Sequence, residues 1–295
     1  MASTPTTSPT GTPTRNRTSA AVRRLLLGAL SLGLAGSLVA CSGDDTDNGG
    51  TTPPTPGASQ TPAGAPPAAP ARGACYPLPF ETAVAPTSEV EPVACRKAHT
   101  SETVSVGTID ALVDGHLLAV DSDRVQAQVA TACPQALRRY VGGTLEQLRL
   151  SMIRPVWFTP TVEESDAGAD WYRCDAVLLA GTSKLAELTT SLKGVLGRAR
   201  GRDRYAMCGT AAPDAKSFQR VLCTARHSWR AIDVVVFRDG AYPGEKRVRA
   251  AGRSQCEDAA ADVAEDPLAF EWGYEWPTKE QWEMGQAFGR CWAPD

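Results

Sequence analysis

A fifteen-residue segment occurs twice in this sequence and restricts the fold more than any other feature. Residues 160–174 and residues 277–291 both begin with Pro-Thr, carry a glycine at the ninth position and end in Arg-Cys. In each copy, the threonine and the Glu or Gln three residues later form the pattern of a helix capping box. The glycine suits the left-handed residue that ends a short helix. The repetition therefore predicts two short capped helices, each followed by a strand that carries a cysteine.

The repetition extends towards the N-terminus. The pattern Val-x-Cys-x-x-x-His occurs at residues 93–99 and again at 221–227, and alternating apolar residues follow both, as in a half-buried strand. A stretch whose apolar residues recur with the period of a helix, with a cysteine near its middle, then begins near Ser122 in the first copy. In the second copy this stretch covers residues 248–263. Pro134 lies inside the first of these helices and predicts a kink or a break there.

These observations together predict an α+β fold of two tandem repeats. Each repeat should contain a small, mostly antiparallel sheet, one main helix and one short capped helix, held by disulfides. The predicted boundaries are residues 74–200 for the first repeat and residues 201–295 for the second. We expect each repeat to fold as an autonomous module.

The N-terminal region has the features of an exported lipoprotein. Arg23 and Arg24 precede an uncharged segment, residues 25–40, which is shorter than the roughly 20 residues that a membrane span needs. The following Leu-Val-Ala-Cys resembles the lipobox of bacterial lipoproteins. We expect residues 1–40 to be a signal peptide and Cys41 to be diacylated, which places the protein on the extracytoplasmic face of the cell membrane. The alternative is an uncleaved signal anchor. Residues 1–21 form a long polar lead, and translation starting at Val22 is a further hypothesis.

Residues 41–73 should form a tether behind the lipid. They are rich in Pro, Thr, Gly and Ala without apolar periodicity, so they are expected to be disordered and to extend on the order of 90 Å. The signal peptide contains four of the 30 basic residues and none of the 33 acidic ones, so the mature chain has a net charge of −7. This sign argues against a nucleic-acid partner, and membrane attachment should come from the lipid.

Nine cysteines indicate a disulfide-bonded protein once Cys41 is lipidated, because the remaining eight are an even number in an oxidising compartment. Four cysteines in each repeat allow three pairings. A helix cysteine facing a strand cysteine is a natural link between layers, so the favoured pairs are Cys133–Cys174, Cys256–Cys291, Cys75–Cys95 and Cys208–Cys223. Each should stabilise the fold by about 3 kcal/mol. A redox function is not expected, since Cys-x-x-Cys is missing.

The sequence predicts neither a cofactor nor a metal centre. Cys95 with His99 and Cys223 with His227 have the spacing of zinc ligands, but bridging the cysteines leaves one histidine in each repeat. We expect each imidazole to hydrogen-bond the turn after the first strand. Catalytic motifs such as Gly-x-Ser-x-Gly, Ser-x-x-Lys and a Gly-rich phosphate loop are missing. We therefore predict no catalytic residues and no enzyme, with an enzyme of unrecognised type as the alternative.

An aromatic stripe is the main candidate for ligand binding. Phe270, Trp272, Tyr274 and Trp276 lie two residues apart, which places them on one face of a predicted strand. If the stripe is exposed, it forms a stacking platform for wall sugars. If it is buried, it forms the core beneath the helix, and we favour the core because large aromatic side chains are mostly buried. The candidate ligand-binding residues are thus Trp272, Tyr274, Trp276, His99 and His227.

The combined motifs carry a resemblance to a known family. The sequence resembles the septum-formation-related domain of actinobacterial lipoproteins and membrane proteins. The resemblance rests on Val-x-Cys-x-x-x-His, the central helix cysteine, Pro-Thr with its later glycine, the last-strand cysteine and Ser-Leu-Lys-Gly at residues 191–194. The resemblance covers residues 74–197. It continues more loosely in the second repeat, which lacks Ser-Leu-Lys-Gly. It implies a role in division or envelope biology and supplies no catalytic residues.

These expectations define three classes of function. The leading one is a non-catalytic lipoprotein that binds or scaffolds an unknown envelope or septal protein. The second is a module that binds wall polymer through the aromatic stripe, and the third is an unrecognised enzyme.

Overall fold

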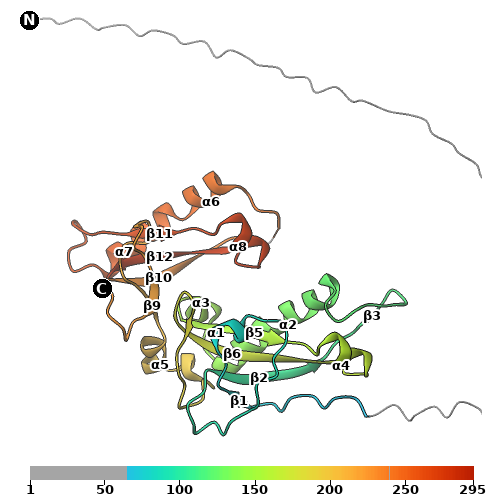
Figure 1. Cartoon of the computed structure of the whole chain (residues 1–295). Helices are drawn as coiled ribbons and strands as arrows, with labels where there is room; N and C mark the ends of the chain where they lie inside the picture. The colour runs from blue at the N-terminus through green and yellow to red at the C-terminus, as the bar shows by residue number, and fades with distance from the viewer. Residues whose placement is uncertain (1–64, 239) are drawn as a thin grey trace, which may run out of the picture. The chain divides into compact units, whose positions relative to one another are not determined.

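The computed structural model describes residues 65–238 and 240–295, which belong to one compact unit. The predicted signal peptide, Cys41 and most of the predicted tether lie outside these described residues. The fold is α+β with antiparallel sheets, as expected (Figure 1).

The first half of the described chain is a five-stranded sheet with helices. The sheet has the order β1-β2-β6-β5, with β7 paired to β6. Its strands are β1 (Cys75–Tyr76), β2 (Ser101–Thr108), β5 (Ile153–Phe158), β6 (Trp171–Gly181) and β7 (Lys184–Leu185). The helices are α1 (Phe80–Ala83), α2 (Asp123–Val141), α3 (Leu145–Arg149), α4 (Val162–Asp166), the 3-10 helix η1 (Val195–Gly197) and α5 (Ala199–Arg204). A small hairpin, β3 (Leu112–Val113) and β4 (His116–Leu117), follows β2.

The second half has its own five-stranded sheet, with the order β11-β12-β10-β8-β9. Its strands are β8 (Met207–Gly209), β9 (Arg220–Leu222), β10 (Trp229–Val236), β11 (Gly273–Glu275) and β12 (Phe288–Pro294). Its helices are α6 (Glu245–Ala251), α7 (Arg253–Val263) and α8 (Lys279–Glu283).

The two halves follow the same path. In each half, the two long central strands are antiparallel: β2 pairs with β6, and β10 pairs with β12. The strand that comes between them in the sequence, β5 or β11, pairs with the other edge of the later central strand, β6 or β12. The pairing register also shifts at matching places, around Val104 in β2 and around Ile232 in β10. Because a β-bulge inserts one unpaired residue at a defined position, matching bulges indicate that the two strands are equivalent.

Both predicted capping boxes form. Thr161 caps α4, and Thr278 caps α8. In each case the threonine hydroxyl accepts from the backbone N–H of the third helical residue, whose side chain accepts from the backbone N–H of the threonine. Gly168 and Gly285 end these helices at φ of 97° and 88°, the left-handed region expected from the sequence. Thr144 and Gln147 form a further capping box on α3 that the sequence analysis missed.

The main helices differ from the prediction in both halves. Helix α2 runs through Pro134 without a break, because its buried face and the Cys133 disulfide hold it to the sheet on both sides of the proline. The second main helix instead divides into α6 and α7 at Gly252. There, the ring of Tyr274 approaches so closely that a Cβ at Gly252 would collide with it. Val263, expected on the buried helix face, is exposed.

Four disulfides connect the eight cysteines in the favoured pairs. Cys133–Cys174 and Cys256–Cys291 join a main helix to the later central strand, and Cys75–Cys95 and Cys208–Cys223 fasten a loop to the first strand. Each disulfide stays within one half. The pairing therefore repeats along with the strand order.

The halves are nevertheless not autonomous, because they share a hydrophobic core. Backbone hydrogen bonds join Met152 N to Tyr205 O at 2.8 Å and Met207 N to Leu150 O at 2.9 Å, so the segments on both sides of the linker are paired. Trp292 of β12 is fully buried and meets the ring of Phe218 edge-on at 5.1 Å. One cluster contains Leu137, Met152, Ile153 and Leu196 from the first half and Met207, Trp229, Ala231 and Trp292 from the second. The expectation of independent modules was wrong, because buried apolar side chains of both sheets belong to one cluster.

An arginine-rich contact adds to the connection between the halves. Glu275 pairs with Arg220 and lies 3.5 Å from Nη1 of Arg290. Arg290 Nε also donates to the carbonyl oxygen of Arg149 at 2.9 Å. Burial lowers the pKa of Arg290 to about 10, and burial followed by the charges of Arg290 and Arg220 lowers the pKa of Arg154 to about 9. The second half is therefore anchored to the first by polar as well as apolar contacts.

Candidate binding site: a pocket of tryptophans and arginines

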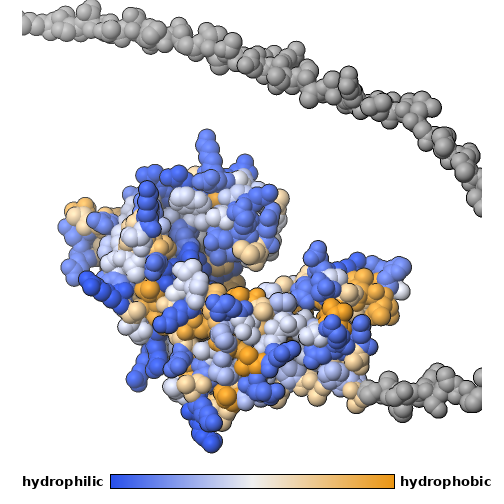
Figure 2. All heavy atoms as spheres, in the orientation of Figure 1, coloured by the Kyte–Doolittle hydropathy of each residue, from blue (hydrophilic) through white to orange (hydrophobic). Residues whose placement is uncertain are grey.

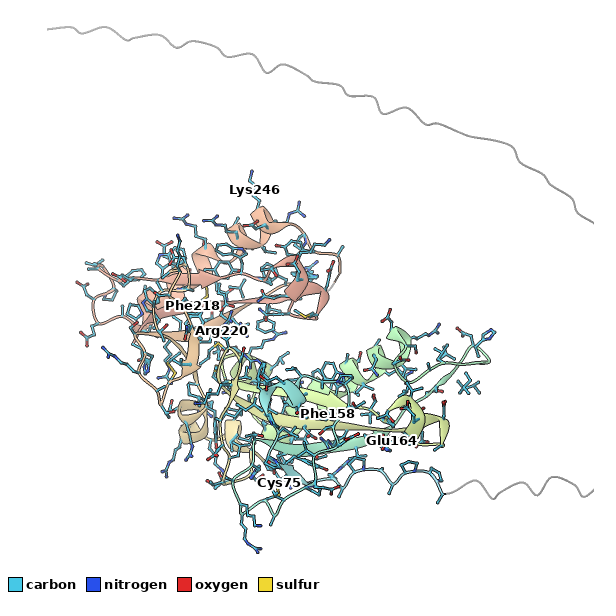
Figure 3. The ribbon with its side chains drawn as sticks, in the orientation of Figure 1. Cys75, Phe158, Glu164, Phe218, Arg220 and Lys246 are labelled. Atoms are coloured by element: carbon cyan, nitrogen blue, oxygen red, sulfur yellow. A yellow bond between two sulfur atoms is a disulfide. The ribbon has the colours of Figure 1, made fainter. Side chains whose placement is uncertain are left out.

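The aromatic stripe forms part of a pocket on the second half. The pocket has a volume of about 640 Å³. It is lined by Trp272, Gly273, Tyr274 and Trp276 around β11, by Lys246, Arg249 and Arg253 of the α6–α7 segment, and by Pro213, Asp214 and Glu245. Lys246 is visible on α6 in Figure 3. Three separate parts of the sequence thus combine to form the pocket.

Tyr274 fixes the position of β11 beneath α6 and α7. Its side chain is buried, its ring lies against Gly252 and Gly289, and its hydroxyl donates to the carbonyl oxygen of Val248 at 3.1 Å. Burial raises the pKa of Tyr274, so this hydroxyl keeps its proton at neutral pH. If either glycine were replaced by a larger residue, the new Cβ would collide with the ring of Tyr274. Tyr274 is therefore a structural residue, as the core interpretation predicted.

The two tryptophans that flank Tyr274 are only half-buried. Trp272 and Trp276 pack against the core at one edge and line the pocket at the other. The guanidinium of Arg253 lies 5.8 Å from the ring centroid of Trp272, and that of Arg249 lies 4.8 Å from the ring centroid of Trp276. These distances are those of cation–π contacts. The predicted continuous strand through residues 270–276 is limited to Gly273–Glu275, so the stripe is neither a bare platform nor entirely core.

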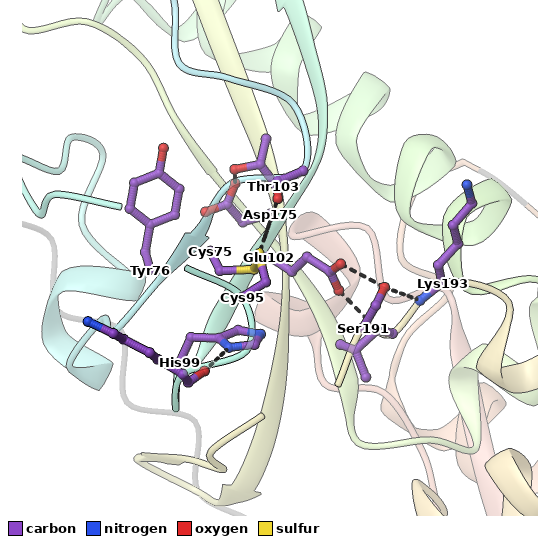
Figure 4. The surroundings of a disulfide bond; sticks show 12 residues. Cys75, Tyr76, Cys95, His99, Glu102, Thr103, Asp175, Ser191 and Lys193 are labelled. Carbon is purple, nitrogen blue, oxygen red and sulfur yellow. Dashed lines mark hydrogen bonds between the residues drawn. A yellow bond between two sulfur atoms is a disulfide. The ribbon is translucent and has the colours of Figure 1, made fainter. Parts of the chain in front are cut away.

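His99 occupies a closed environment in the first half. Its side chain is 1% exposed, and Nδ1 donates to the carbonyl oxygen of Lys97 at 2.8 Å, which is the turn contact that the sequence predicted. Its Nε2 is buried and has no hydrogen-bond partner. The side chain therefore closes the turn after the first disulfide loop, as Figure 4 shows.

His227 makes the same turn contact but lies beside a pocket of about 640 Å³. Its Nδ1 is 2.7 Å from the carbonyl oxygen of Ala225, and its Nε2 is 3.2 Å from Oδ2 of Asp295. Among the described residues, neither this imidazole nor that of His99 is hydrogen-bonded to a serine, threonine or cysteine side chain. In the described part of the chain, hydrogen bonds therefore pair this histidine with an acid and not with a nucleophilic side chain.

The same region contains a group of three residues with potential metal ligands. The ligand atoms of Cys208, His227 and Asp295 lie within 4.8 Å of one another. Cys208, however, is bonded to Cys223, so its sulfur is not a thiolate. A disulfide sulfur is a poor zinc ligand, which leaves this group with two donors.

Glu102 is a buried acid that the sequence analysis did not identify. Its carboxylate accepts hydrogen bonds from Tyr140, from the hydroxyl of Ser191 at 2.7 Å and from the backbone N–H of Leu192 at 2.9 Å (Figure 4). Burial, followed by the Glu102 hydrogen bond, raises the pKa of Tyr140 to about 12, so the phenol remains a donor. Part of the Ser-Leu-Lys-Gly motif thus holds an acid on β2. Since Gly194 N also donates to the carbonyl oxygen of Tyr140 at 2.8 Å, the motif fastens the end of α2 as well.

A second buried polar group lies on the first sheet. Asp175 accepts hydrogen bonds from Ser101 at 2.7 Å and Thr103 at 2.8 Å, and its carboxylate lies 3.2 Å from Nε of Arg173. The guanidinium of Arg173 is stacked between the rings of Tyr76 and Phe158, at 3.9 and 4.3 Å from their centroids. Burial raises the pKa of the Asp175 carboxyl, while Arg173 and the two hydroxyls act in the opposite direction. The pair has no opening to solvent, and its role is structural.

Comparison with known protein families decides the family of this chain. The model of the family described as "Septum formation" matches residues 72–291, which includes both sheets, the four disulfides and the tryptophan and arginine pocket. The chain belongs to the septum formation family. The match runs through both halves as a single region and does not by itself divide them into two copies. Searches of curated proteins and of solved structures found no match.

The septum formation domain also exposes an apolar hairpin. Leu112 and Leu117 face each other across β3 and β4 and are 62% and 82% exposed. The hairpin turns at Asp114 and Gly115, both with positive φ, as a two-residue turn requires. Figure 2 shows apolar side chains gathered at this end of the first half. In the described part of the chain, no helix is long and apolar enough to span a bilayer.

Proposed function

We propose that this septum formation protein is a non-catalytic, lipid-anchored extracytoplasmic module that binds or scaffolds partners in envelope or septum assembly. The observation that carries the proposal is the family match over residues 72–291. The four disulfides support an extracytoplasmic location, because disulfides persist in oxidising compartments. The proposal also treats the two halves as duplicated copies of one unit, supported by their matching strand order, bulges and disulfide pairs.

In-cell photocrosslinking tests this function. A photoreactive residue at Leu117, on the exposed hairpin, should give adducts with envelope or septal proteins in dividing cells. The same residue at fully buried Leu137 is the matched control and should give none. Adducts confined to cytoplasmic proteins would contradict the proposal. Soluble fragments released from purified peptidoglycan by the pure protein would contradict its non-catalytic part.

The lipid anchor is tested separately, because Cys41 lies outside the described residues. Cys41→Ala should release the protein from membranes or leave it unprocessed, since the lipid acceptor sulfur is lost. The measurement is membrane fractionation followed by a mass determination of the full-length chain. Ser42→Ala, which keeps the cysteine, should remain in the membrane fraction at mature size. A Cys41→Ala protein of mature size that stays in membranes would refute the anchor.

A specific observation favours a second candidate function, the binding of wall carbohydrate. Trp272 and Trp276 each present an accessible edge in a pocket that also contains donors and acceptors for hydroxyl groups. Aromatic rings together with a few polar groups are typical of small-ligand sites. The buried Tyr274 is not available for stacking, so this candidate uses the two tryptophans alone.

A further inference from the structure

Lys246, Arg249 and Arg253, the cations of the tryptophan pocket, are exposed, unlike several buried or half-buried arginines of this chain that pair with acids. Arg173, Arg220, Arg230 and Arg290 each lie within 4 Å of a carboxylate oxygen. In the part of the chain that the structure describes, Lys246, Arg249 and Arg253 form no ion pair and no side-chain hydrogen bond. Three positive charges thus line the pocket together with two acids, Asp214 and Glu245, and no ion pair joins them among the described residues.

The cation–π contacts of the two arginines leave their hydrogen-bonding capacity intact. A guanidinium has five N–H donors, and an attraction between its charge and an aromatic ring does not require any of them to form a conventional hydrogen bond. Arg249 over Trp276 and Arg253 over Trp272 are therefore held in place without using their donors. Such a guanidinium is suited to a planar carboxylate or a phosphate, which it binds through two parallel hydrogen bonds.

The remaining lining suits the rest of a sugar. Asp214 and Glu245 offer oxygen acceptors for hydroxyl groups, and the indoles offer flat apolar faces. A neutral sugar would use the rings and the acids but would leave the three cations unsatisfied. A simple inorganic anion would use the cations but not the rings. A saccharide with an acidic substituent uses all three kinds of group.

We propose that this pocket binds an anionic saccharide. Its sugar ring lies against Trp272 or Trp276, and its carboxylate or phosphate is held by Arg249, Arg253 and Lys246. The proposal gives a ligand class to the wall-binding candidate function and rests on it. Two sources share this chemistry, and the test separates them. They are the free lactyl carboxylate of peptidoglycan strands that carry no stem peptide and the phosphates of other wall polymers.

The test uses two disaccharides that differ in one acidic group. The probes are N-acetylglucosaminyl-N-acetylmuramic acid, which has a lactyl carboxylate, and di-N-acetylchitobiose, which does not. N-acetylglucosamine 1-phosphate, which joins a sugar ring to a phosphate, represents the phosphate source. Each is titrated into the ¹⁵N-labelled mature chain while the indole N–H signals are followed by NMR. We expect the signals of Trp272 and Trp276 to shift and the signal of fully buried Trp292 to stay in place.

The expected result is at least tenfold tighter binding of one acidic probe than of chitobiose. Arg249→Gln/Arg253→Gln should weaken the acidic probe at least tenfold and change chitobiose binding little, because a charge-assisted hydrogen bond contributes about 1.5–3 kcal/mol and tenfold is 1.4 kcal/mol. Arg226→Gln, which changes an exposed arginine outside the pocket, is the matched control and should bind as the unchanged protein does. Tighter binding of the muramic acid probe or of the sugar phosphate identifies the source.

Three results would overturn the proposal. They are equal affinity for acidic and neutral disaccharides, unchanged affinity of the double arginine variant for the acidic probe, and no indole shift with any probe. Trp272→Phe keeps an aromatic ring that packs against the core, so the variant should fold. A loss of binding in this variant therefore does not come from a loss of folding. Pelleting with purified cell walls is measured in parallel on the full mature chain. If the double arginine variant pellets as well as the unchanged protein, the wall-binding function survives and the pocket assignment does not.

Discussion

Trp292→Ala should lower the free energy of unfolding by about 3–5 kcal/mol and destabilise both halves of the domain together. The side chain is completely buried, and the cluster around it contains Leu137 and Met152 of the first half as well as Met207 of the second. Truncation would leave a cavity that neither sheet can fill alone. Because the cavity opens at the shared core, its cost should appear in the stability of the whole unit.

Denaturant unfolding and hydrogen exchange test this prediction. Unfolding should remain a single transition, and the amides of β2 and β6 should lose protection in parallel with those of β10 and β12. Trp276→Ala is the matched control, since that indole is half-buried at the pocket, and it should cost clearly less. Loss of protection confined to residues 205–295 would show that the halves unfold independently.

Asp175→Ala should lower the free energy of unfolding by about 3–5 kcal/mol, because it leaves a buried arginine without its anion. The side chain of Arg173 is 4% exposed and stacked between two aromatic rings, so its charge has no route to solvent. The hydroxyls of Ser101 and Thr103 would lose their acceptor at the same time. Adding Arg173→Met, which removes the charge but fills the space between the rings, should restore part of the lost stability.

The control for this prediction is an exposed ion pair. Asp203→Ala removes a partner of Arg230 in a pair whose acid is 74% exposed, and it should cost less than about 1 kcal/mol. Thermal and denaturant unfolding of the variants give the comparison. Equal stability of Asp175→Ala and Asp203→Ala would mean that the buried pair does not contribute as its geometry implies.

Local signals in the sequence were sufficient for the local structure. Thr161 with Glu164 and Thr278 with Gln281 predicted capped helices because a capping box involves neighbouring residues only. The paired spacing of cysteines and histidines predicted the four disulfides and the turn contacts of His99 and His227, since the repetition provided two independent examples of each. The break that Pro134 predicted does not occur in α2, because tertiary packing and a disulfide outweigh one missing hydrogen bond.

The candidate site was only partly predictable. Alternation placed Trp272, Tyr274 and Trp276 on one face of the chain, and the structure keeps them together. Alternation does not say what covers that face. The arginines over Trp272 and Trp276 come from the α6–α7 segment, some twenty residues earlier in the chain, and Pro213 and Asp214 come from a still more distant loop.

The sequence by itself determined the repeated order of strands and helices and the resemblance to the septum formation family. It favoured one of three disulfide pairings in each half, and the structure contains that pairing. These properties depend on residue type and on spacing along the chain, which are visible in one dimension. The tertiary structure alone decided that Trp292 completes a core shared by both halves, that Glu102 receives the Ser-Leu-Lys-Gly motif, and that three unpaired cations surround two tryptophans. These depend on which distant surfaces meet, because burial and charge pairing are set by neighbours in space.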